Sequence, residues 1–129
     1  MKNVLFTSLF VLLVVLLVAC NGGRQAGVPD PANMVERYLQ AKISGDSDTI
    51  RELLCSEMEA ELERELHAFD TVADARLEDV SCIGINAFTV SCEGRIVATY
   101  GTEETEFPLS TYRIVDEDNT WKWCGEASQ

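Results

Sequence analysis

An apolar run close to the amino terminus limits what this chain can fold into, because it removes the first residues from any packed domain. Residues 4–19 hold 14 apolar side chains out of 16. A helix that spans a membrane usually needs about 20 apolar residues, so a run of this length after Lys2 favours an export signal. From Cys20 onward, the chain has 45 apolar residues out of 110, with 9 basic and 22 acidic residues and a net charge of −13. We therefore expect one small acidic domain, whose charge argues against binding to nucleic acid.

The end of the apolar run has the pattern of a lipid attachment site. Leu17-Val18-Ala19-Cys20 resembles the lipobox of bacterial lipoproteins. The resemblance implies that residues 1–19 are a signal peptide that is cut away and that the thiol of Cys20 carries a diacylglycerol. Acyl chains such as palmitate, at about 0.8 kcal/mol per buried CH₂, would then hold the protein on the extracytoplasmic face of a cell membrane. An uncleaved anchor and a cleaved, soluble secretory form remain as alternatives, and both also place the domain outside the cytoplasm.

Residues 20–29 link the expected lipid to the domain. The nine residues 21–29 are rich in glycine and show no hydrophobic periodicity, which predicts a flexible tether with a reach of about 15–18 Å. The domain is expected to cover residues 30–126, and residues 127–129 form a short C-terminal tail. The tether would therefore keep the domain close to the membrane.

Four further cysteines follow the lipidation site, and an even number in a small exported domain predicts two disulfides. Cys82 and Cys92 lie in two strand-like runs, and a short hairpin loop between them would place the two side chains directly opposite each other. Cys55 is then left to pair with Cys124. The cysteines stand singly, without a Cys-x-x-Cys pair, and this spacing disfavours both a metal site and a redox-active dithiol.

Helix signals follow one another from residue 30 to about residue 70. Asp30 is suited to cap a first helix that starts with a proline, and Gly45 is suited to the position just past its end. Ser47 is expected to cap a short second helix that ends near residue 55. A capping-box pattern at Ser56 predicts a third helix, which runs to about residue 70. The first helix has one buried face, formed by Met34, Val35, Tyr38, Leu39, Ala41 and Ile43.

Beyond residue 75 the hydrophobic pattern becomes that of strands. Residues 77–85 and 88–100 are expected to form a first hairpin, and residues 105–115 and 120–124 a second. Pro108 has no N–H to donate, so an edge position or a bulge is expected there. Helices followed by strands predict an α+β fold, with N-terminal helices packed on one face of a curved antiparallel sheet.

The second hairpin leaves its register open. A turn made of residues 116–119 would set Ile114 beside Trp121, and Tyr112 beside Trp123, on a face that should belong to the core. The same register turns the last cysteine to the other side. Two alternatives follow: the sheet twists at its end, or the register is off by one.

The order of these elements resembles that of the nuclear transport factor 2-like superfamily. The match is carried by residues 35–46 in the first helix, by residues 52–56 at the end of the second, and by Trp121-Lys-Trp-Cys124. More narrowly, the domain is similar to small lipoproteins of uncharacterised function that carry such a domain after a lipobox. The resemblance covers residues 30–126 and implies a cone, in which the sheet curls around the helices and leaves a cavity at the wide end. In that superfamily the cavity can hold small ligands, and some members are enzymes such as steroid isomerases.

Five residues are candidates for the lining of such a pocket. Tyr38 could project into it from the first helix, although a core position with the hydroxyl at the rim is the simpler account. Asp79 and Arg95 fall opposite each other in the register that aligns the two central cysteines, where a cross-strand ion pair is the simpler account and a pocket acid the alternative. Tyr112 and Trp123 complete the set.

The sequence shows neither a catalytic set nor a metal-binding motif. His67 lies off the apolar stripe of the third helix, so a solvated position is expected. Glu57, Glu61 and Glu65 share one helix face at four-residue spacing. Calcium sites usually draw their oxygen ligands from a turned loop, so we expect a solvated acidic face and no metal or cofactor. A docking face for a basic partner remains as an alternative.

Three functions remain for a membrane-anchored, extracytoplasmic lipoprotein with a small disulfide-stapled α+β domain, and the third is a structural role in which the anchoring itself matters. The first is a non-catalytic binding or accessory module, which is favoured because the sequence shows no catalytic set. The second is a small-molecule carrier or small enzyme that uses a cone-shaped pocket. The second requires an open cavity with a polar group buried inside it, and it fails if every carboxylate lies on the surface.

Overall fold

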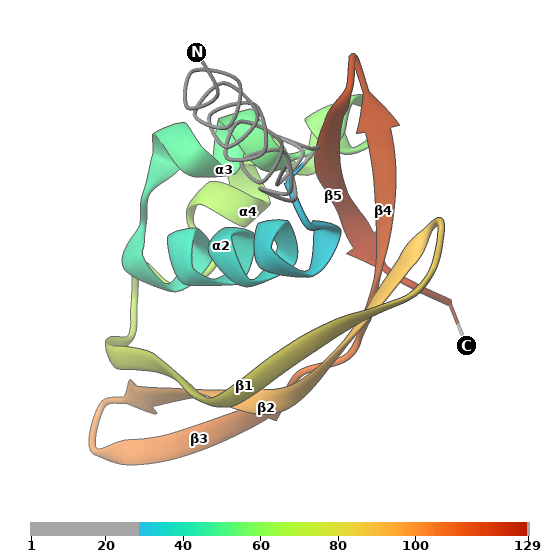
Figure 1. Cartoon of the computed structure of the whole chain (residues 1–129). Helices are drawn as coiled ribbons and strands as arrows, with labels where there is room; N and C mark the ends of the chain where they lie inside the picture. Colours follow the sequence, from blue (N-terminus) through green and yellow to red (C-terminus); the bar gives the residue numbers. More distant parts are fainter. Residues whose placement is uncertain (1–28, 129) are drawn as a thin grey trace, which may run out of the picture.

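The computed structural model describes residues 29–128 of the chain, and Figure 1 shows how their elements are arranged. The expected signal peptide, Cys20 and the tether up to residue 28 lie outside the described residues. The helices come first and pack on one antiparallel sheet that curves around them, so the predicted α+β class is confirmed. The elements are α2 (Pro31–Ser44), α3 (Ser47–Leu53), the 3₁₀ helix η2 (Ser56–Glu61), α4 (Leu62–Leu66), β1 (Ala73–Asn86), β2 (Thr89–Tyr100), β3 (Glu103–Pro108), β4 (Thr111–Glu117) and β5 (Thr120–Glu126).

Helix α2 begins and ends where the sequence predicts. The carboxylate of Asp30 accepts a hydrogen bond of 3.0 Å from the N–H of Ala32, and proline occupies the first turn. Gly45 closes the helix at a φ of 69°, a left-handed conformation that costs glycine little. The predicted apolar stripe is buried, and Val35 and Tyr38 are fully shielded from solvent. None of the helices between residues 29 and 128 is long and apolar enough to cross a membrane.

The starts of the next two helices differ from the prediction. Helix α3 is capped by Asp46, whose carboxylate accepts from the N–H of Thr49, and not by Ser47. The predicted third helix divides into η2 and the short α4. The capping box at Ser56 does not form, because the backbone N–H and the hydroxyl of Ser56 both donate hydrogen bonds of 2.8 Å to Glu117 of β4.

The sheet is built around the long β1–β2 hairpin, with the strand order β1-β2-β4-β5 and with β3 paired to β2. Residues 105–115, predicted as one strand, belong to β3 and β4, which bond to the two halves of β2 and are separated by Leu109 and Ser110. Pro108 is the last residue of β3, which pairs with β2 alone. The expected edge position is therefore confirmed.

Both predicted disulfides are present. Cys82 and Cys92 occupy directly opposed positions of β1 and β2, with their Cα atoms 4.1 Å apart. Cys55 is bonded to Cys124 of β5. The second bridge is supported by the backbone, since the N–H of Cys55 donates to the carbonyl oxygen of Trp123 over 2.9 Å. It ties the helical half of the domain to the last strand.

The predicted register of the β4–β5 hairpin is wrong. Ile114 pairs with Trp123 and not with Trp121. The turn consists of two residues, Asp118 and Asn119, which both have left-handed φ values (55° and 61°); this is the type I′ geometry that matches the twist of a hairpin. Because the error is two residues, Ile114 and Trp123 still share one face, and both are buried.

The alternative of a register off by one is wrong, since the error is two residues, and the end of β5 is irregular in addition. Tyr112 pairs with Glu126 and not with Trp123, after a register shift between Tyr112 and Ile114. Gly125 adopts a φ of 93° within this stretch. Side chains on both sides of the strand are therefore buried at this point, Trp123 among them.

Candidate functional site

A cavity of about 490 Å³ lies between the helices and the sheet. Its walls come from α2, η2, α4 and all strands except β1, so the cavity forms only when the two layers have packed. Four charged residues line it: Lys42, Arg64, Glu65 and Glu126. The apolar part of the wall includes Leu39, Phe69, Ile96, Leu109, Tyr112 and Trp123.

A carboxylate is buried at the helical side of this cavity. Glu65 of α4 is 3% exposed, and its Oε2 accepts a hydrogen bond of 2.8 Å from the Tyr38 hydroxyl and lies 2.7 Å from Lys42 Nζ. Its Oε1 lies 3.7 Å from a guanidinium nitrogen of Arg64. A buried carboxylate without partners would be costly. Lys42 therefore compensates its charge, the Tyr38 hydroxyl satisfies it with a hydrogen bond, and both contacts hold α4 against α2.

This position corrects the expectation of a solvated acidic face. Glu57 and Glu61 do remain accessible, each in an ion pair with an arginine. Glu65 does not, because the 3₁₀ geometry of η2 breaks the spacing on which the shared face depended. The sequence contained a usable signal, since Glu65 follows Leu62 by three residues and precedes Leu66, inside the apolar stripe. The described part of the chain holds no group of three or more His, Cys, Asp or Glu side chains arranged to bind a metal ion.

Three aromatic and cationic contacts surround Trp123. The Tyr38 ring stacks on it with centroids 4.3 Å apart, the Tyr112 ring lies 6.1 Å away, and Lys42 Nζ lies 5.6 Å from its centroid. Burial raises the pKa of Tyr38 far above its ordinary value, and the charge of Glu65 raises it further. Burial also raises the pKa of Tyr112. The buried Nε1 of Trp123 has no hydrogen-bond partner among residues 29–128, so the wall holds an unused donor.

The five predicted pocket residues divide into two groups. Tyr112 and Trp123 line the cavity, and Tyr38 lies directly behind the Trp123 ring. Asp79 and Arg95 do not line it. The structure therefore brings the three aromatic candidates together and separates them from the charged pair.

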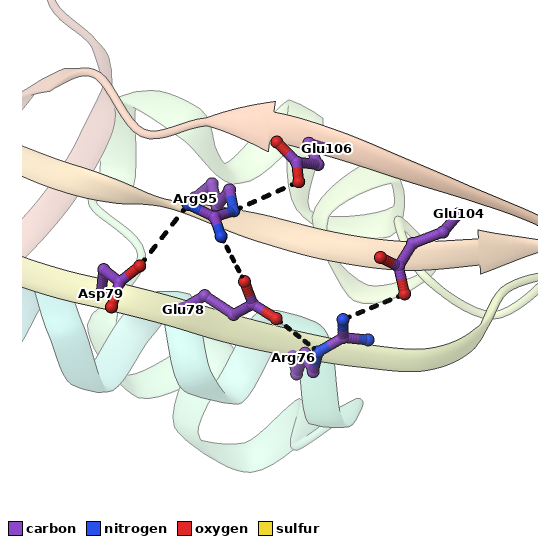
Figure 2. Close-up of polar contacts among 6 residues, drawn as sticks. All are labelled: Arg76, Glu78, Asp79, Arg95, Glu104 and Glu106. Atoms are coloured by element: carbon purple, nitrogen blue, oxygen red, sulfur yellow. Dashed lines mark hydrogen bonds and ion pairs between the residues drawn. The ribbon is translucent and has the colours of Figure 1, made fainter.

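Arg95 belongs to an ion-pair cluster on the sheet face that points away from the helices, and Figure 2 shows this cluster. The predicted pairing with Asp79 is wrong by one residue, because β1 bulges after Glu78 and places Glu78 opposite Arg95. Glu78 Oε2 lies 2.6 Å from the Arg95 guanidinium, and the 81% exposed Asp79 lies 3.5 Å away. A hydrogen bond from Arg76 lowers the pKa of Glu78 below its ordinary value. The predicted cross-strand ion pair between Asp79 and Arg95 therefore exists, and Glu78 forms a second, shorter one with the same guanidinium.

His67 lies at the surface, as expected. Its Nδ1 is 2.5 Å from the carboxylate of Asp70 and its Nε2 is 3.6 Å from that of Glu63. The contact with Asp70 raises the pKa of His67 above its ordinary value. His67 does not line the cavity, so the imidazole and the buried carboxylate do not form one site.

No family model and no curated protein matches this chain. Two solved structures are similar to it. One is an NTF2-like protein of unknown function in nutrient uptake from Rhodospirillum rubrum, with 17% identity, a TM-score of 0.48 and coverage of 74% of this chain and 94% of that chain. The other is a putative ketosteroid isomerase from Shewanella frigidimarina, with 14% identity, a TM-score of 0.49 and coverage of 75% and 93%. These likenesses concern the fold alone.

Proposed function

We propose that this protein is a lipid-anchored, extracytoplasmic binding domain that holds a small, largely apolar molecule between its helices and its sheet. The observation that carries the proposal is a cavity of about 490 Å³ whose wall is mostly apolar and contains one buried carboxylate, Glu65. Sites for small molecules typically measure about 300–1,000 Å³ and combine an apolar lining with a few placed polar groups. A cavity filled by its own aromatic side chains would have favoured a protein partner instead.

The polar groups of the wall suggest the chemistry of the ligand. The aromatic rings of Tyr112 and Trp123 suit a flat or aliphatic body. Lys42 retains N–H groups beyond the one directed at Glu65, and Trp123 Nε1 is an unused donor. We therefore expect a ligand with an apolar body and an oxygen that accepts hydrogen bonds.

The same contacts favour binding over catalysis. A general acid or base, most often a histidine or a carboxylate, must be available to the substrate. The buried wall carboxylate, Glu65, already has the hydroxyl of Tyr38 and the ammonium of Lys42 on the same oxygen. The second wall carboxylate, Glu126, is exposed, and His67 lies outside the wall. A small enzyme that uses this pocket is the alternative, and turnover of a bound molecule would favour it.

The proposed location depends on the pattern of residues 17–20. Acylation of Cys20 would hold the domain at a membrane outside the cytoplasm. The two disulfides support export, because such bonds persist in oxidising compartments. Intact-mass measurement of the mature protein tests this part: the expected mass starts at an acylated Cys20, and an unmodified chain that retains residues 1–19 would contradict it.

The cavity is tested with a fluorescent probe that has an aromatic body and one anionic group, 8-anilinonaphthalene-1-sulfonate. We expect saturable binding of one probe per full-length chain. Leu109→Trp should fill the cavity and lower the affinity at least tenfold. The matched control is Ile83→Asn, which removes exposed apolar surface outside the cavity and should leave saturable binding unchanged. Equal affinities in the Leu109 variant and the unsubstituted protein would refute the cavity as the binding site.

A further inference from the structure

The end of the β1–β2 hairpin exposes three large apolar side chains. Ile83, Ile85 and Phe88 are 62%, 54% and 69% exposed. Ile83 and Ile85 lie two residues apart near the end of β1, where the pairing with β2 shifts register between Gly84 and Asn86, and Phe88 lies in the turn that follows. Isolated apolar residues are common on protein surfaces, whereas a group of them at one projecting turn marks an interaction site.

The same segment is free of charge. Residues 80–92 contain no Asp, Glu, Lys or Arg, although these residues make up 25% of the chain. The other end of the β1–β2–β3 unit differs sharply, because β3 begins with Glu103 and Glu104. A segment without charge is suited to the boundary between lipid headgroups and acyl chains, where each unpaired charge would be costly. The charge opposite Thr89 on the neighbouring strand, Arg113, is paired with Glu57.

A hydrogen bond places this tip at the end of the molecule where the chain enters the domain. The N–H of Cys82 on β1 donates to Glu36 Oε1 over 3.1 Å, and Glu36 lies in the second turn of α2. The start of α2 is thus about 8 Å away along the helix, at 1.5 Å per residue. Figure 1 agrees, since the β1–β2 turn and the first residues of α2 lie on the same side of the view and the β2–β3 turn lies on the other.

We propose that the tip formed by Ile83, Ile85 and Phe88 inserts into the lipid surface that carries the anchor at Cys20. This inference rests on the lipid anchor of the proposed function. The described chain begins nine residues after Cys20, a span of about 15–18 Å for a glycine-rich coil. The tip extends about four residues beyond Cys82, or about 14 Å at 3.4 Å per residue. Anchor and tip can therefore reach one bilayer together, with the acidic β2–β3 turn held away from it.

The experiment places a tryptophan at the tip of the full-length protein and asks whether lipid quenches it. Phe88→Trp is reconstituted in phosphatidylcholine vesicles with or without bromine atoms on the acyl chains. The matched control is Tyr100→Trp, which puts the same probe on a 43% exposed position at the opposite end of β2. The signal of the two native tryptophans is subtracted with the unsubstituted protein. We expect bromine to reduce the added F88W fluorescence at least twofold and to leave the added Y100W fluorescence unchanged.

Three results would overturn the proposal. The first is equal quenching of both variants, and the second is no quenching of F88W. The third is a blue shift of the F88W fluorescence that increases with the amount of protein per vesicle and does not depend on bromination. Such a shift would mean that the tip contacts a second copy of the chain instead of lipid. Intact mass, measured on the same samples, separates the two ideas: an acylated protein with an unquenched F88W refutes tip insertion and leaves the anchor intact.

Discussion

The hydroxyl of Tyr38 donates a hydrogen bond of 2.8 Å to Glu65, and the two residues are 27 positions apart in the sequence. The hydrogen bond links α2 to α4 beside the cavity. The ring of the same tyrosine stacks on Trp123. The Tyr38 side chain thus packs in the core with its ring and binds the buried carboxylate with its hydroxyl. Its removal tests whether the helical side of the site depends on this link.

Tyr38→Phe keeps the ring and removes the hydroxyl. Hydrogen bonds to charged groups contribute about 1.5–3 kcal/mol, so we expect the free energy of unfolding to fall by about that amount. Urea denaturation measures it as a lower midpoint with an unchanged slope. Tyr100→Phe, at an exposed position, is the control and should change stability by less than about 0.5 kcal/mol. Similar losses in both variants would contradict the role of the Glu65 contact.

Stability should fall above about pH 10 through Tyr38. Burial, and then the charge of Glu65, raise the pKa of Tyr38 above its ordinary value of 10.0 in the folded protein. Below the ordinary value both states keep the proton, and the full stability is present. Above it only the unfolded state loses the proton, so unfolding becomes easier by up to about 1.4 kcal/mol per pH unit and per group. Burial of Tyr112 acts in the same direction. Urea midpoints at increasing pH should therefore fall less steeply for Tyr38→Phe than for the unsubstituted protein.

Lys42 compensates the charge of Glu65, and its loss should be severe. Lys42→Met leaves a nearly buried carboxylate with one partner fewer, and breaking a buried ion pair costs about 3 kcal/mol or more. The control is Arg37→Met, which breaks an ion pair of similar length, 2.9 Å, between half-exposed side chains of Arg37 and Glu52. Such pairs contribute at most about 1 kcal/mol. Denaturation curves that show equal losses for both variants would argue that Glu65 is not effectively buried.

The two disulfides should differ in their contribution to stability. They close loops with sequence separations of 69 and 10 residues, which correspond to about 4.4 and 2.8 kcal/mol in the loop-entropy model. Replacing Cys55 and Cys124 together by alanine should therefore destabilise the domain by about 1.6 kcal/mol more than replacing Cys82 and Cys92. Thermal unfolding of the two double variants compares them directly. The reverse order would mean that local packing at the hairpin outweighs chain entropy.

Gly94 should tolerate no side chain. It has a φ of 103°, and a Cβ atom there would lie 2.6 Å from the backbone oxygen of Glu78 at the bulge. A side chain at this backbone conformation costs about 1–3 kcal/mol, and the clash with the Glu78 oxygen adds to that cost. Gly94→Ala should therefore lower the free energy of unfolding by about 2 kcal/mol or more. Gly84→Ala is the control, because a Cβ at that position has open space around it, and it should be nearly neutral. Hydrogen exchange at β1 and β2 would locate the damage.

The parts of the fold that depend on neighbouring residues could be predicted from the sequence. Asp30 and Gly45 bound α2 because capping involves groups within one or two turns of the helix. The bridge between Cys82 and Cys92 could be predicted because the two residues belong to one hairpin. The candidate site was predicted in part: Tyr112 and Trp123 line the cavity, since aromatic residues on the inner face of a sheet must lie near the core.

What the sequence by itself determined is thus the class of the fold, the pairing of the cysteines and the burial of α2, all of which follow from periodicity, capping and parity. Only the tertiary structure decided the rest. Ser56 gives its N–H and hydroxyl to Glu117, 61 residues away, instead of capping its own helix. Glu65 is buried because Lys42 and Tyr38 reach it from another helix. In each case a partner distant in sequence offers a polar group a better contact than its neighbours do, and such competition is settled only when the layers pack.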